Sequence, residues 1–291
     1  MSTPDTLSPQ QFYEELTKRN SGLIAVESQA KLRAARIVVA GCGSTGGAAV
    51  LPLVRTGATR FLLADPDRFE LSNLNRQNAT LADIGENKAA VAARSVEAVN
   101  PHASVEVLAG GIPASHAAAL LTKKDVIIDA IDVTTMSGIA AKRALHEAAV
   151  SVRVPVITAY DIAACQFIEV FDYRSGGEPF AGKVGDARSP EDVLGALIPP
   201  TALPEEILPI ISEGTVAPAA GFPQLAMTAQ LFGALVVPIV LRILGDQPLP
   251  AHVRVDLFGV TTPRPARFAR RVRTLMKLPV VWLGARRKAH R

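Results

Sequence analysis

Residues suited to holding and cutting a polyphosphate are concentrated in one short part of the chain, between Asp65 and Lys88. Displacement at phosphorus puts negative charge on the phosphoryl oxygens and the leaving group, and preorganised donors and cations stabilise that charge. Asn73, Arg76 and Lys88 are donors of this kind. Asp65 precedes them at the end of an apolar run, where a carboxylate usually accepts hydrogen bonds from ribose hydroxyls. The spacing therefore favours a site for a nucleotide triphosphate.

A glycine loop lies about twenty residues before this cluster, directly after the apolar residues 37–40, and reads Gly41-Cys42-Gly43-Ser44-Thr45-Gly46. Glycines after a strand let the backbone turn tightly and approach a phosphate, while the following helix offers unpaired N–H groups and the positive end of its dipole. Gly41, Gly43 and Gly46 fit those places, with Ser44 among them. An NAD(P) site would share the loop and Asp65, but it would leave the later donors unexplained.

A divalent metal would help to neutralise a triphosphate, and two aspartates are placed to bind one. Asp129 and Asp132 follow the apolar residues 126–128, beyond the carboxyl end of a strand, where ligands bind in open α/β sheets. We expect Asp132 to hold Mg²⁺, with Asp129 as the alternative. The glycine loop lacks the lysine of a Walker sequence, so the cations on the phosphates must come from elsewhere in the chain.

These motifs resemble those of the ThiF/MoeB/HesA superfamily, the ubiquitin-activating-enzyme-like adenylyltransferases. The resemblance covers roughly residues 19–171 and is specific over 36–132, which hold the glycine loop, an Asp-x-Asp, the run Leu-Ser-Asn-Leu-Asn-Arg-Gln and an Asp-x-x-Asp. It implies that Asp65 binds the ATP ribose and that Asp132 holds magnesium. It also implies that Asn73, Arg76 and Lys88 bind the phosphates.

Three further residues take expected roles from the same resemblance. Gln77 closes the motif that contains Arg76. Asp67 either assists the nucleotide or braces the loop, and both interpretations stay open. Members of the superfamily use an arginine near the N-terminus that reaches across a homodimer to the partner's ATP. Arg19, which we expect on an amphipathic N-terminal helix, is the match in this chain.

The resemblance implies activation of a carboxylate as an acyl-adenylate. The C-terminus of a small protein or peptide would attack the α-phosphorus of ATP and expel pyrophosphate, with catalysis by positioning and charge stabilisation. The final acyl acceptor stays open between a sulfur donor, an amine and an internal group of the substrate. Two alternatives remain: an NAD(P)-dependent oxidoreductase, and a non-catalytic dimeric ThiF-like binding protein.

Cysteine content separates this chain from many members of the superfamily. Cys42 and Cys165 are its only cysteines, so a four-thiolate zinc site within one chain is excluded. Relatives that form a thioester place a cysteine in the segment corresponding to residues 182–221, which contains none. We expect no zinc, no thioester in the usual place, and two buried packing thiols. Few cysteines and no long apolar run in residues 1–20 lead us to expect a cytoplasmic protein without a secretory signal.

Alternating strand and helix patterns predict an α/β protein with a doubly wound, mostly parallel Rossmann-like sheet. The predicted strands are 36–40, 60–64, 104–109, 126–129 and 154–159, and the predicted helices are 46–56, 87–99, 115–121 and 135–150. An antiparallel strand over 166–173 and a glycine-rich loop over 175–185 follow. We expect four parts: an N-terminal helical arm (1–34), an ATP-binding subdomain (35–160), a substrate and dimer subdomain (161–250) and a basic C-terminal segment (251–291).

The composition of three later segments supports further expectations. Seven prolines within 190–223 predict little regular structure. Residues 225–244 are long and apolar enough for a membrane span, but they contain Gln230, Gly233 and Pro238, so we expect a buried core helix and no transmembrane segment. From residue 251 onward eleven Lys and Arg accompany only Asp256, a local charge of +10 that leaves −6 on residues 1–250.

Part of this basic segment, residues 268–277, could form a basic amphipathic helix. Three interpretations are open for it: a tail packed partly on the body, a dock for an acidic partner protein, and a contact with an anionic membrane or nucleic acid.

Overall fold

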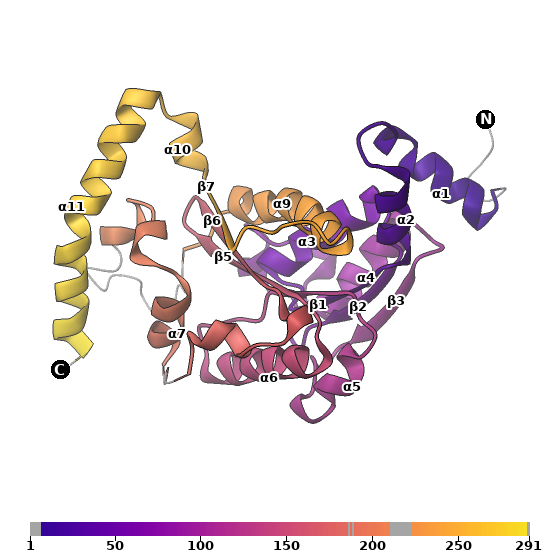
Figure 1. The fold of residues 1–291 in the computed structure, drawn as a ribbon, viewed down its shortest axis with the longest axis horizontal. Helices are drawn as coiled ribbons and strands as arrows, with labels where there is room; N and C mark the ends of the chain where they lie inside the picture. Colours follow the sequence, from indigo (N-terminus) through magenta and orange to yellow (C-terminus); the bar gives the residue numbers. More distant parts are fainter. Residues whose placement is uncertain (1–6, 186, 188, 210–222, 290–291) are drawn as a thin grey trace.

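The computed structural model describes residues 7–185, 187, 189–209 and 223–289. Its centre is a seven-stranded sheet in the order β3-β2-β1-β4-β5-β6-β7 (Figure 1). The strands are β1 Arg36–Ala40, β2 Arg60–Ala64, β3 Ser104–Leu108, β4 Val126–Asp129, β5 Val156–Ile162, β6 Cys165–Phe171 and β7 His252–Asp256. The first five strands pair in parallel, and β6 and β7 are antiparallel additions. This architecture confirms the predicted fold class and the predicted antiparallel strand.

Helices cover both faces of the sheet (Figure 1). The helices are α1 Pro9–Thr17, α2 Val26–Ala34, α3 Ser44–Thr56, α4 Lys88–Val99, α5 Ala117–Leu121, α6 Met136–Val152, α7 Pro190–Leu197, α9 Ala226–Leu244, α10 Leu257–Thr261 and α11 Arg264–Ala289. Apolar side chains of α2, α3, α4 and α9 pack in one core with alternate residues of the strands. Those of α5, α6 and α7 pack in a second core with the remaining strand residues. Strands buried on both faces explain the continuous apolar runs in the sequence.

The order of the strands places the functional motifs at one edge of the sheet. The chain passes from β1 outward to β2 and β3, then returns to β4 on the other side of β1. The carboxyl ends of β1 and β4 therefore flank the point where the winding direction reverses, which is where open α/β sheets bind ligands. The glycine loop follows β1, and Asp129 ends β4.

The apolar helix α9 (Ala226–Leu244) packs one face on the body of the fold. Phe232, Val236 and Val240 are fully buried in the core beside α3. A Cβ at Gly233 would lie 2.4 Å from the Ala48 carbonyl oxygen, so glycine permits the close approach of α9 to α3. By length and composition α9 is the one helix in the described part of the chain that could cross a membrane. Its packing on α3 is that of a core helix, as the sequence led us to expect.

The proline-rich segment is more regular than the sequence predicted. Ser189 caps α7 (Pro190–Leu197), accepting a hydrogen bond from the Asp192 N–H, and Pro190 occupies the first helical turn. Proline is tolerated there because its missing N–H would be unpaired anyway, so this proline starts a helix. The expectation of little regular structure over 190–223 was therefore wrong for its first part. Residues 210–222 lie outside the described residues.

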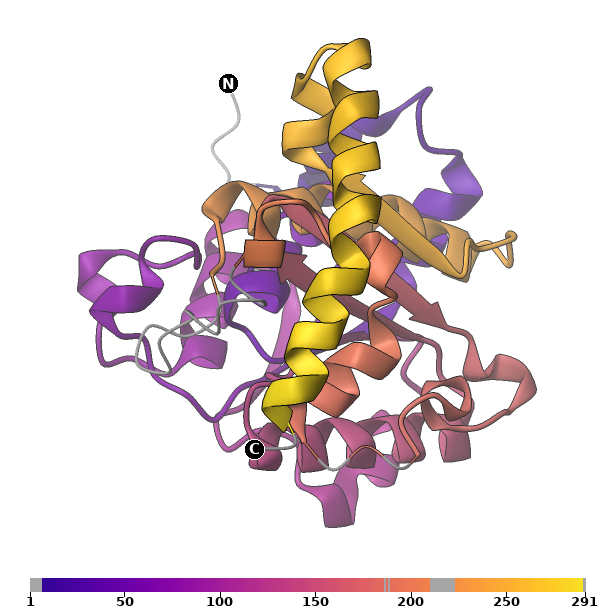
Figure 2. The same cartoon turned by 90° about the vertical axis from the view of Figure 1, so that its left-hand side faces the viewer.

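The basic C-terminal segment contains one strand that the sequence did not predict and one helix that it did. Strand β7 (His252–Asp256) extends the sheet beside β6, and the predicted basic helix is the longer α11 (Arg264–Ala289). Figure 2 shows α11 running along the outside of the molecule, in front of the other elements. Arg273 and Lys277 each contact Glu205 at 3.1 Å, and Arg270 pairs with Glu206. One side of α11 is thus packed on the body, while the division into four parts stays a prediction.

Candidate functional site

The glycine loop has a backbone shape that requires glycine at two of its positions. Gly41 has φ +91°, and a Cβ there would lie 2.4 Å from the Ala130 carbonyl oxygen at the end of β4. A Cβ at Gly46 would lie 1.8 Å from the Gly41 carbonyl oxygen. The loop therefore packs closely between β1 and β4, and it places the first turn of α3 at the carboxyl edge of the sheet.

The first turn of α3 offers donors that could hold a phosphate. Helix N-termini leave their first N–H groups without intrahelical partners, and here no side chain caps them. These groups belong to Ser44, Thr45 and Gly46. Together with the helix dipole they form a concentration of positive charge that suits an anion. The phosphate-binding assignment of Gly41, Gly43, Ser44 and Gly46 stays a prediction, and this geometry is compatible with it.

Asp65 binds the glycine loop directly. It is 4% exposed; its Oδ2 accepts a hydrogen bond from the Cys42 N–H at 2.6 Å, and its Oδ1 accepts one from the Asp67 N–H at 2.8 Å. Burial raises the pKa of this carboxyl, and the two backbone N–H groups oppose the rise. Asp65 therefore braces the loop in the structure. Ribose binding through its remaining lone pairs stays a prediction.

Lys88 and Asp67 form an ion pair beside the loop. The Lys88 Nζ lies 3.0 Å from Asp67 Oδ2, with the lysine side chain 10% exposed and the aspartate 66% exposed. Asn87 caps α4 and also donates its amide N–H to the Asp65 carbonyl at 2.8 Å. Lys88 is buried and held at a fixed place by Asp67, which faces solvent. A phosphate could replace Asp67 as the partner of this ammonium or bind it together with Asp67.

Arg76 carries a charge that no carboxylate neutralises within the described residues. Its guanidinium donates to three neutral oxygens: Gln224 Oε1 at 2.6 Å, Asn75 Oδ1 at 2.8 Å and the Ser72 carbonyl at 3.1 Å. These contacts orient the guanidinium without cancelling its charge. A guanidinium held in this way suits an anionic ligand.

The neighbours of Arg76 add two amides. Asn73 Oδ1 accepts a hydrogen bond from the Glu70 N–H at 3.1 Å, which leaves its amide nitrogen as a donor. Gln77 Oε1 is buried and has no partner among the described residues. A Cβ at Gly43 would lie 3.6 Å from the Gln77 amide, so this side chain lies against the loop. A buried oxygen without a donor is costly, and it marks a place where a ligand hydroxyl or water would fit.

The two candidate metal ligands lie in opposite environments. Asp129 is fully buried, pairs with Lys142, and contacts His146 Nε2 at 2.9 Å and Thr158 Oγ1 at 3.0 Å. Burial alone would raise its pKa, but Lys142 and His146 lower it to about 2. Asp132 is exposed and accepts hydrogen bonds from the Thr134 N–H and hydroxyl. Asp129 is thus committed to a structural network, whereas Asp132 is free to face a ligand.

The residues present fit Mg²⁺ only together with a phosphate ligand. In the described part of the chain, no group of three or more His, Cys, Asp and Glu side chains could enclose a metal ion. Magnesium usually binds through one or two carboxylates plus substrate phosphates and water. A single exposed aspartate at the carboxyl edge of β4 meets that requirement, although the assignment of Asp132 stays a prediction.

Arg19 lies apart from these residues within one chain. It is exposed in the short 3₁₀ helix Lys18–Asn20, which directly follows α1. An exposed arginine could reach a second copy of the chain, and that role stays a prediction.

Asp161 is a buried carboxylate at this edge that sequence reasoning missed. It lies near the end of β5, is 5% exposed, and accepts a hydrogen bond from the Ser44 hydroxyl at 2.8 Å. The one signal in the sequence was an acidic residue at the end of an apolar run, as at Asp65. The predicted strand ended at residue 159, so Asp161 fell just outside the pattern. The structure extends β5 to Ile162 and turns the carboxylate toward the loop.

Both cysteines are free and buried, as expected. Burial raises the pKa of Cys42, and it raises that of Cys165 to about 11. A thiol with so high a pKa holds almost no nucleophilic thiolate near neutral pH.

Replacing Cys165 with alanine should therefore leave carboxylate activation unchanged. The substitution removes a sulfur atom from the core and should lower the free energy of unfolding by about 1 kcal/mol, since only a small side chain is lost. ATP–pyrophosphate exchange and a thermal melt would measure the two effects. Loss of exchange in a folded variant would show that this thiol takes part in the reaction.

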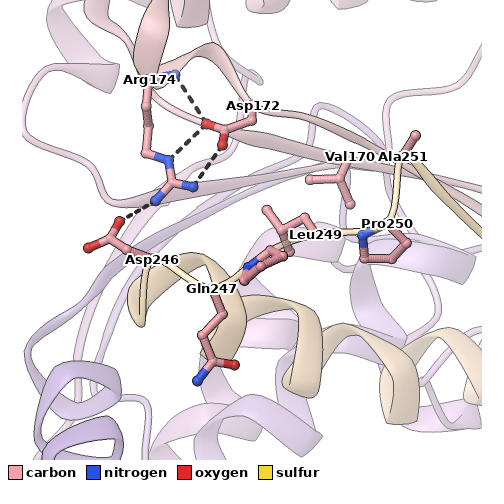
Figure 3. A pocket seen from close by; sticks show the side chains of 9 residues that line it. Val170, Asp172, Arg174, Asp246, Gln247, Leu249, Pro250 and Ala251 are labelled. Atoms are coloured by element: carbon pink, nitrogen blue, oxygen red, sulfur yellow. Dashed lines mark hydrogen bonds and ion pairs between the residues drawn. The ribbon is translucent and has the colours of Figure 1, made fainter.

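A cavity of about 430 Å³ lies elsewhere, between β6 and the segment that joins α9 to β7 (Figure 3). Its polar end is Arg174, which is held between Asp172 and Asp246, and Val170, Leu249 and Pro250 line the rest. Because both carboxylates pair with the arginine, this cavity offers no unpaired cation for a phosphate. The cavity beside the glycine loop is much smaller, about 10 Å³, and is lined by Cys42, Gly47 and Lys88 among others.

The sequence is similar to proteins of known families. A model of the ThiF family matches residues 17–255. An uncharacterized protein of Mycobacterium tuberculosis is 33% identical over 252 residues, which cover 82% of this chain and 34% of that protein. The sulfur carrier protein adenylyltransferase of Thermus thermophilus is 36% identical over 110 residues, 38% of this chain and 41% of that protein. The chain spans about a third of the first curated relative's length and about two fifths of the second's.

Solved structures share the fold. Escherichia coli MccB with ATP superimposes with a TM-score of 0.57 at 20% identity, over 79% of this chain and 63% of that chain. The tRNA N6-threonylcarbamoyladenosine dehydratase TcdA of Escherichia coli superimposes with a TM-score of 0.59 at 21% identity, over 83% of this chain and 98% of that chain. At these identities the likeness establishes the fold alone.

Proposed function

This chain belongs to the ThiF family, and from that premise we propose that it is an ATP-dependent adenylyltransferase that activates a carboxylate. The substrate in this proposal is the C-terminal carboxylate of a small protein or peptide. Relatives named as adenylyltransferases, among them one named for a sulfur carrier protein, support the proposal.

The observation that carries the proposal is a set of positive groups gathered at one edge of the sheet, among which Arg76 has no ion-pair partner within the described residues. The first turn of α3 has no side-chain cap on its backbone N–H groups, although the Ser44 and Thr45 hydroxyls donate to Asp161. Lys88 adds a buried ammonium nearby. Such a set suits a polyphosphate better than the two-phosphate bridge of NAD, which needs no cluster of side-chain cations.

In the proposed reaction a carboxylate oxygen of the substrate attacks the α-phosphorus of ATP. A new oxygen–phosphorus bond forms, the bond from the α-phosphorus to the bridging oxygen breaks, and pyrophosphate leaves with the electron pair. Asn73, Arg76 and Lys88 would stabilise the charge on the phosphates, and Asp65 would orient the ribose. Asp132 would hold Mg²⁺, which supplies further neutralisation of the phosphates.

The second half of the reaction would use an acceptor other than a cysteine of this chain. Cys42 and Cys165 are buried, and burial raises the pKa of each. The acyl-adenylate would therefore pass directly to a sulfur donor, an amine or an internal group of the substrate. Two buried free thiols are also what a reducing compartment favours, so we keep the cytoplasm as the proposed location.

ATP–pyrophosphate exchange tests the proposal. Radiolabelled pyrophosphate should enter ATP when the carboxylate substrate, identified by co-purification and mass spectrometry, is present with Mg²⁺. Binding of NAD(P) without binding of ATP would favour an oxidoreductase instead. Binding of ATP without exchange in the presence of the co-purified substrate would favour a non-catalytic binding protein.

We also propose that the protein acts as a homodimer in which Arg19 reaches the partner's nucleotide. Its exposure in the 3₁₀ helix Lys18–Asn20 supports this role. Mixing Arg19→Ala protein with Arg76→Ala protein tests it, because a heterodimer would contain one site free of both substitutions. Recovery of exchange in the mixture would support the proposal, and no recovery from a mixture with proven heterodimers would refute it.

The partner that we propose for α11 is the acidic surface of the substrate protein. On its outer side Phe268 and Met276 are each 72% exposed, and Val272 and Leu275 complete an apolar stripe at helical spacing. Arg264, Arg267 and Arg271 accompany this stripe and form no ion pairs among the described residues. An apolar stripe beside arginines suits an acidic protein that also buries apolar surface.

Substrate binding should therefore weaken with salt and with loss of this charge. Changing Arg264, Arg267 and Arg271 to glutamine should weaken binding by roughly tenfold, since each partly screened charge pair contributes up to about 1 kcal/mol. Titrations at several salt concentrations would measure both effects, and the exposed Arg60→Gln is the control. Substrate binding that is insensitive to salt and to the triple change would contradict the proposal. Binding of anionic vesicles that is lost in the triple variant would favour a membrane contact instead.

A further inference from the structure

Asp161 lies beside the donors that the first turn of α3 would offer to a phosphate. It comes from β5, and its Oδ2 contacts the first two side chains of α3, the Ser44 hydroxyl at 2.8 Å and the Thr45 hydroxyl at 3.4 Å. The residues in contact are 116 and 117 positions apart in the chain. The carboxylate therefore reaches the N-terminal end of the helix from the neighbouring strand rather than as a local cap.

The other oxygen of Asp161 is also held. With its carboxamide nitrogen directed at acceptors, Gln166 of β6 donates to Asp161 Oδ1 at 2.6 Å and to the Thr228 carbonyl at 2.9 Å. Every direct partner of the carboxylate is thus a neutral donor. Asp161 forms no ion pair within the described residues, although it is only 5% exposed.

A buried carboxylate without a cation partner is unfavourable unless something else stabilises its charge. Here the positive end of the α3 dipole and the donors of its first turn provide that stabilisation. These are the groups that a nucleotide phosphate would use. A second anion at the same helix end would be repelled by the first, because both draw on one region of positive potential.

We propose that Asp161 is an internal anion that opposes nucleotide phosphate at the N-terminal end of α3, and so sets the affinity for ATP. The inference rests on the proposed function, because it takes ATP as the ligand of this helix end. Asp161 is a positioning residue in this scheme, since it acts through Ser44, Thr45 and the helix rather than by touching the nucleotide.

Protonation of Asp161 would remove its electrostatic repulsion of the nucleotide phosphate. Burial raises the pKa of this carboxyl to about 6, while Ser44, Thr45 and the charge of Arg76 oppose the rise. Besides these groups only Gln166 faces it, so Arg76 is the one charged group among its described neighbours. A bound polyphosphate would raise the pKa further, since like charges disfavour ionisation. Protonation and ATP binding therefore favour each other, and the opposition should fade as pH drops through this range.

The variant Asp161→Asn separates the charge from the hydrogen bonds. Its amide oxygen can still accept from Ser44, and the Gln166 carboxamide can turn to present its oxygen to the new amide nitrogen. Calorimetric titration with MgATP would compare this variant with the native protein at about pH 7.5 and about pH 5, where the carboxyl is mostly neutral. Both proteins meet the same protonation state of ATP, so the ratio of their dissociation constants reports on Asp161 alone.

We expect Asp161→Asn to bind MgATP roughly tenfold more tightly at the higher pH, the size expected for one partly screened charge, and the ratio to approach one at the lower pH. The control Asp125→Asn removes the same charge at the opposite end of β4 and should leave the affinity within about twofold. Equal or weaker binding by Asp161→Asn at the higher pH would overturn the inference while leaving the adenylyltransferase proposal standing. Failure of the native protein to bind MgATP at either pH would refute the proposed function itself, and this inference with it.

Discussion

Replacing Arg76 with alanine is expected to abolish ATP–pyrophosphate exchange while the protein stays folded. The guanidinium is oriented by Gln224, Asn75 and Ser72 and carries a charge that no described carboxylate pairs with. Its removal takes one preorganised cation away from the phosphates as charge grows on the leaving pyrophosphate. Loss of one such donor typically lowers the rate by about 10² to 10³, or about 3–4 kcal/mol of barrier.

The substitution should lower mainly the turnover rate of exchange and change the Michaelis constant less, because the interaction strengthens in the transition state. Initial rates at varied MgATP would separate the turnover rate from the Michaelis constant. Arg68→Ala is the matched control: it lies in the same segment, but its guanidinium donates to the Gly85 carbonyl at 2.7 Å. We expect this control to retain exchange within a few-fold, and equal losses in both variants would argue that the segment is merely disturbed.

Asp132→Ala should reproduce the loss and show its connection to magnesium. Asp132 is exposed and accepts hydrogen bonds only from Thr134 among the described residues, so its removal should cost little stability. A residual rate that rises with added Mg²⁺ would fit the role of a metal ligand. Exchange at the native rate would instead exclude Asp132 from the reaction.

The sequence predicted the parts of the fold that depend on local pattern. Each central strand is a continuous apolar run that ends at a glycine or an aspartate, as at Gly41, Asp65 and Asp129, so its position could be read without knowing its neighbours. Parallel strands bring such ends to one edge of the sheet. The candidate residues after β1, β2 and β4 therefore converge as the order of elements requires.

Features that depend on contacts between distant segments could not be predicted in this way. Asp161 meets Ser44 across 117 positions, and Gln224 meets Arg76 across 148. Whether a carboxylate faces a helix end or solvent depends on the packing of β5 against α3, which no local pattern encodes. The same holds for α7, since a high proline content predicts turns unless the first proline happens to start a helix.

The choice between Asp129 and Asp132 depends both on the local sequence pattern and on contacts between distant segments. Both residues follow one apolar run, and their spacing alone left either as a ligand. The buried partners of Asp129, Lys142 and His146, come from α6 and occupy its carboxylate, which favours Asp132 as the proposed ligand. Asp129 then acquires another role, as the centre of a buried ionic network beneath the site.

That network predicts a large loss of stability when its cation is removed. Lys142 is 2% exposed and Asp129 is fully buried, so Lys142→Met would leave a buried carboxylate without its ammonium partner. Breaking a buried pair on one side typically costs about 3–5 kcal/mol, because the remaining charge is neither solvated nor paired. In the native protein burial and the charge of Lys142 lower the pKa of His146, while Asp129 opposes them, so the loss of Lys142 favours a protonated imidazole that offsets part of the missing charge. Urea unfolding would measure the loss, and Lys31→Met, which breaks the exposed pair with Glu27, should cost about 1 kcal/mol or less.

The pH dependence of the loss identifies its cause. In the native protein the pKa of Asp129 is lowered to about 2, so its contribution is present above the unfolded pKa of about 4 and disappears as pH falls from there toward 2. Without Lys142 the folded pKa should lie above the unfolded one, and the variant should recover stability relative to the native protein as pH falls. The double variant Asp129→Asn with Lys142→Met removes both charges and should regain part of the loss near neutral pH. A deficit that is independent of pH and unchanged in the double variant would point to lost packing around Lys142 rather than to an uncompensated charge.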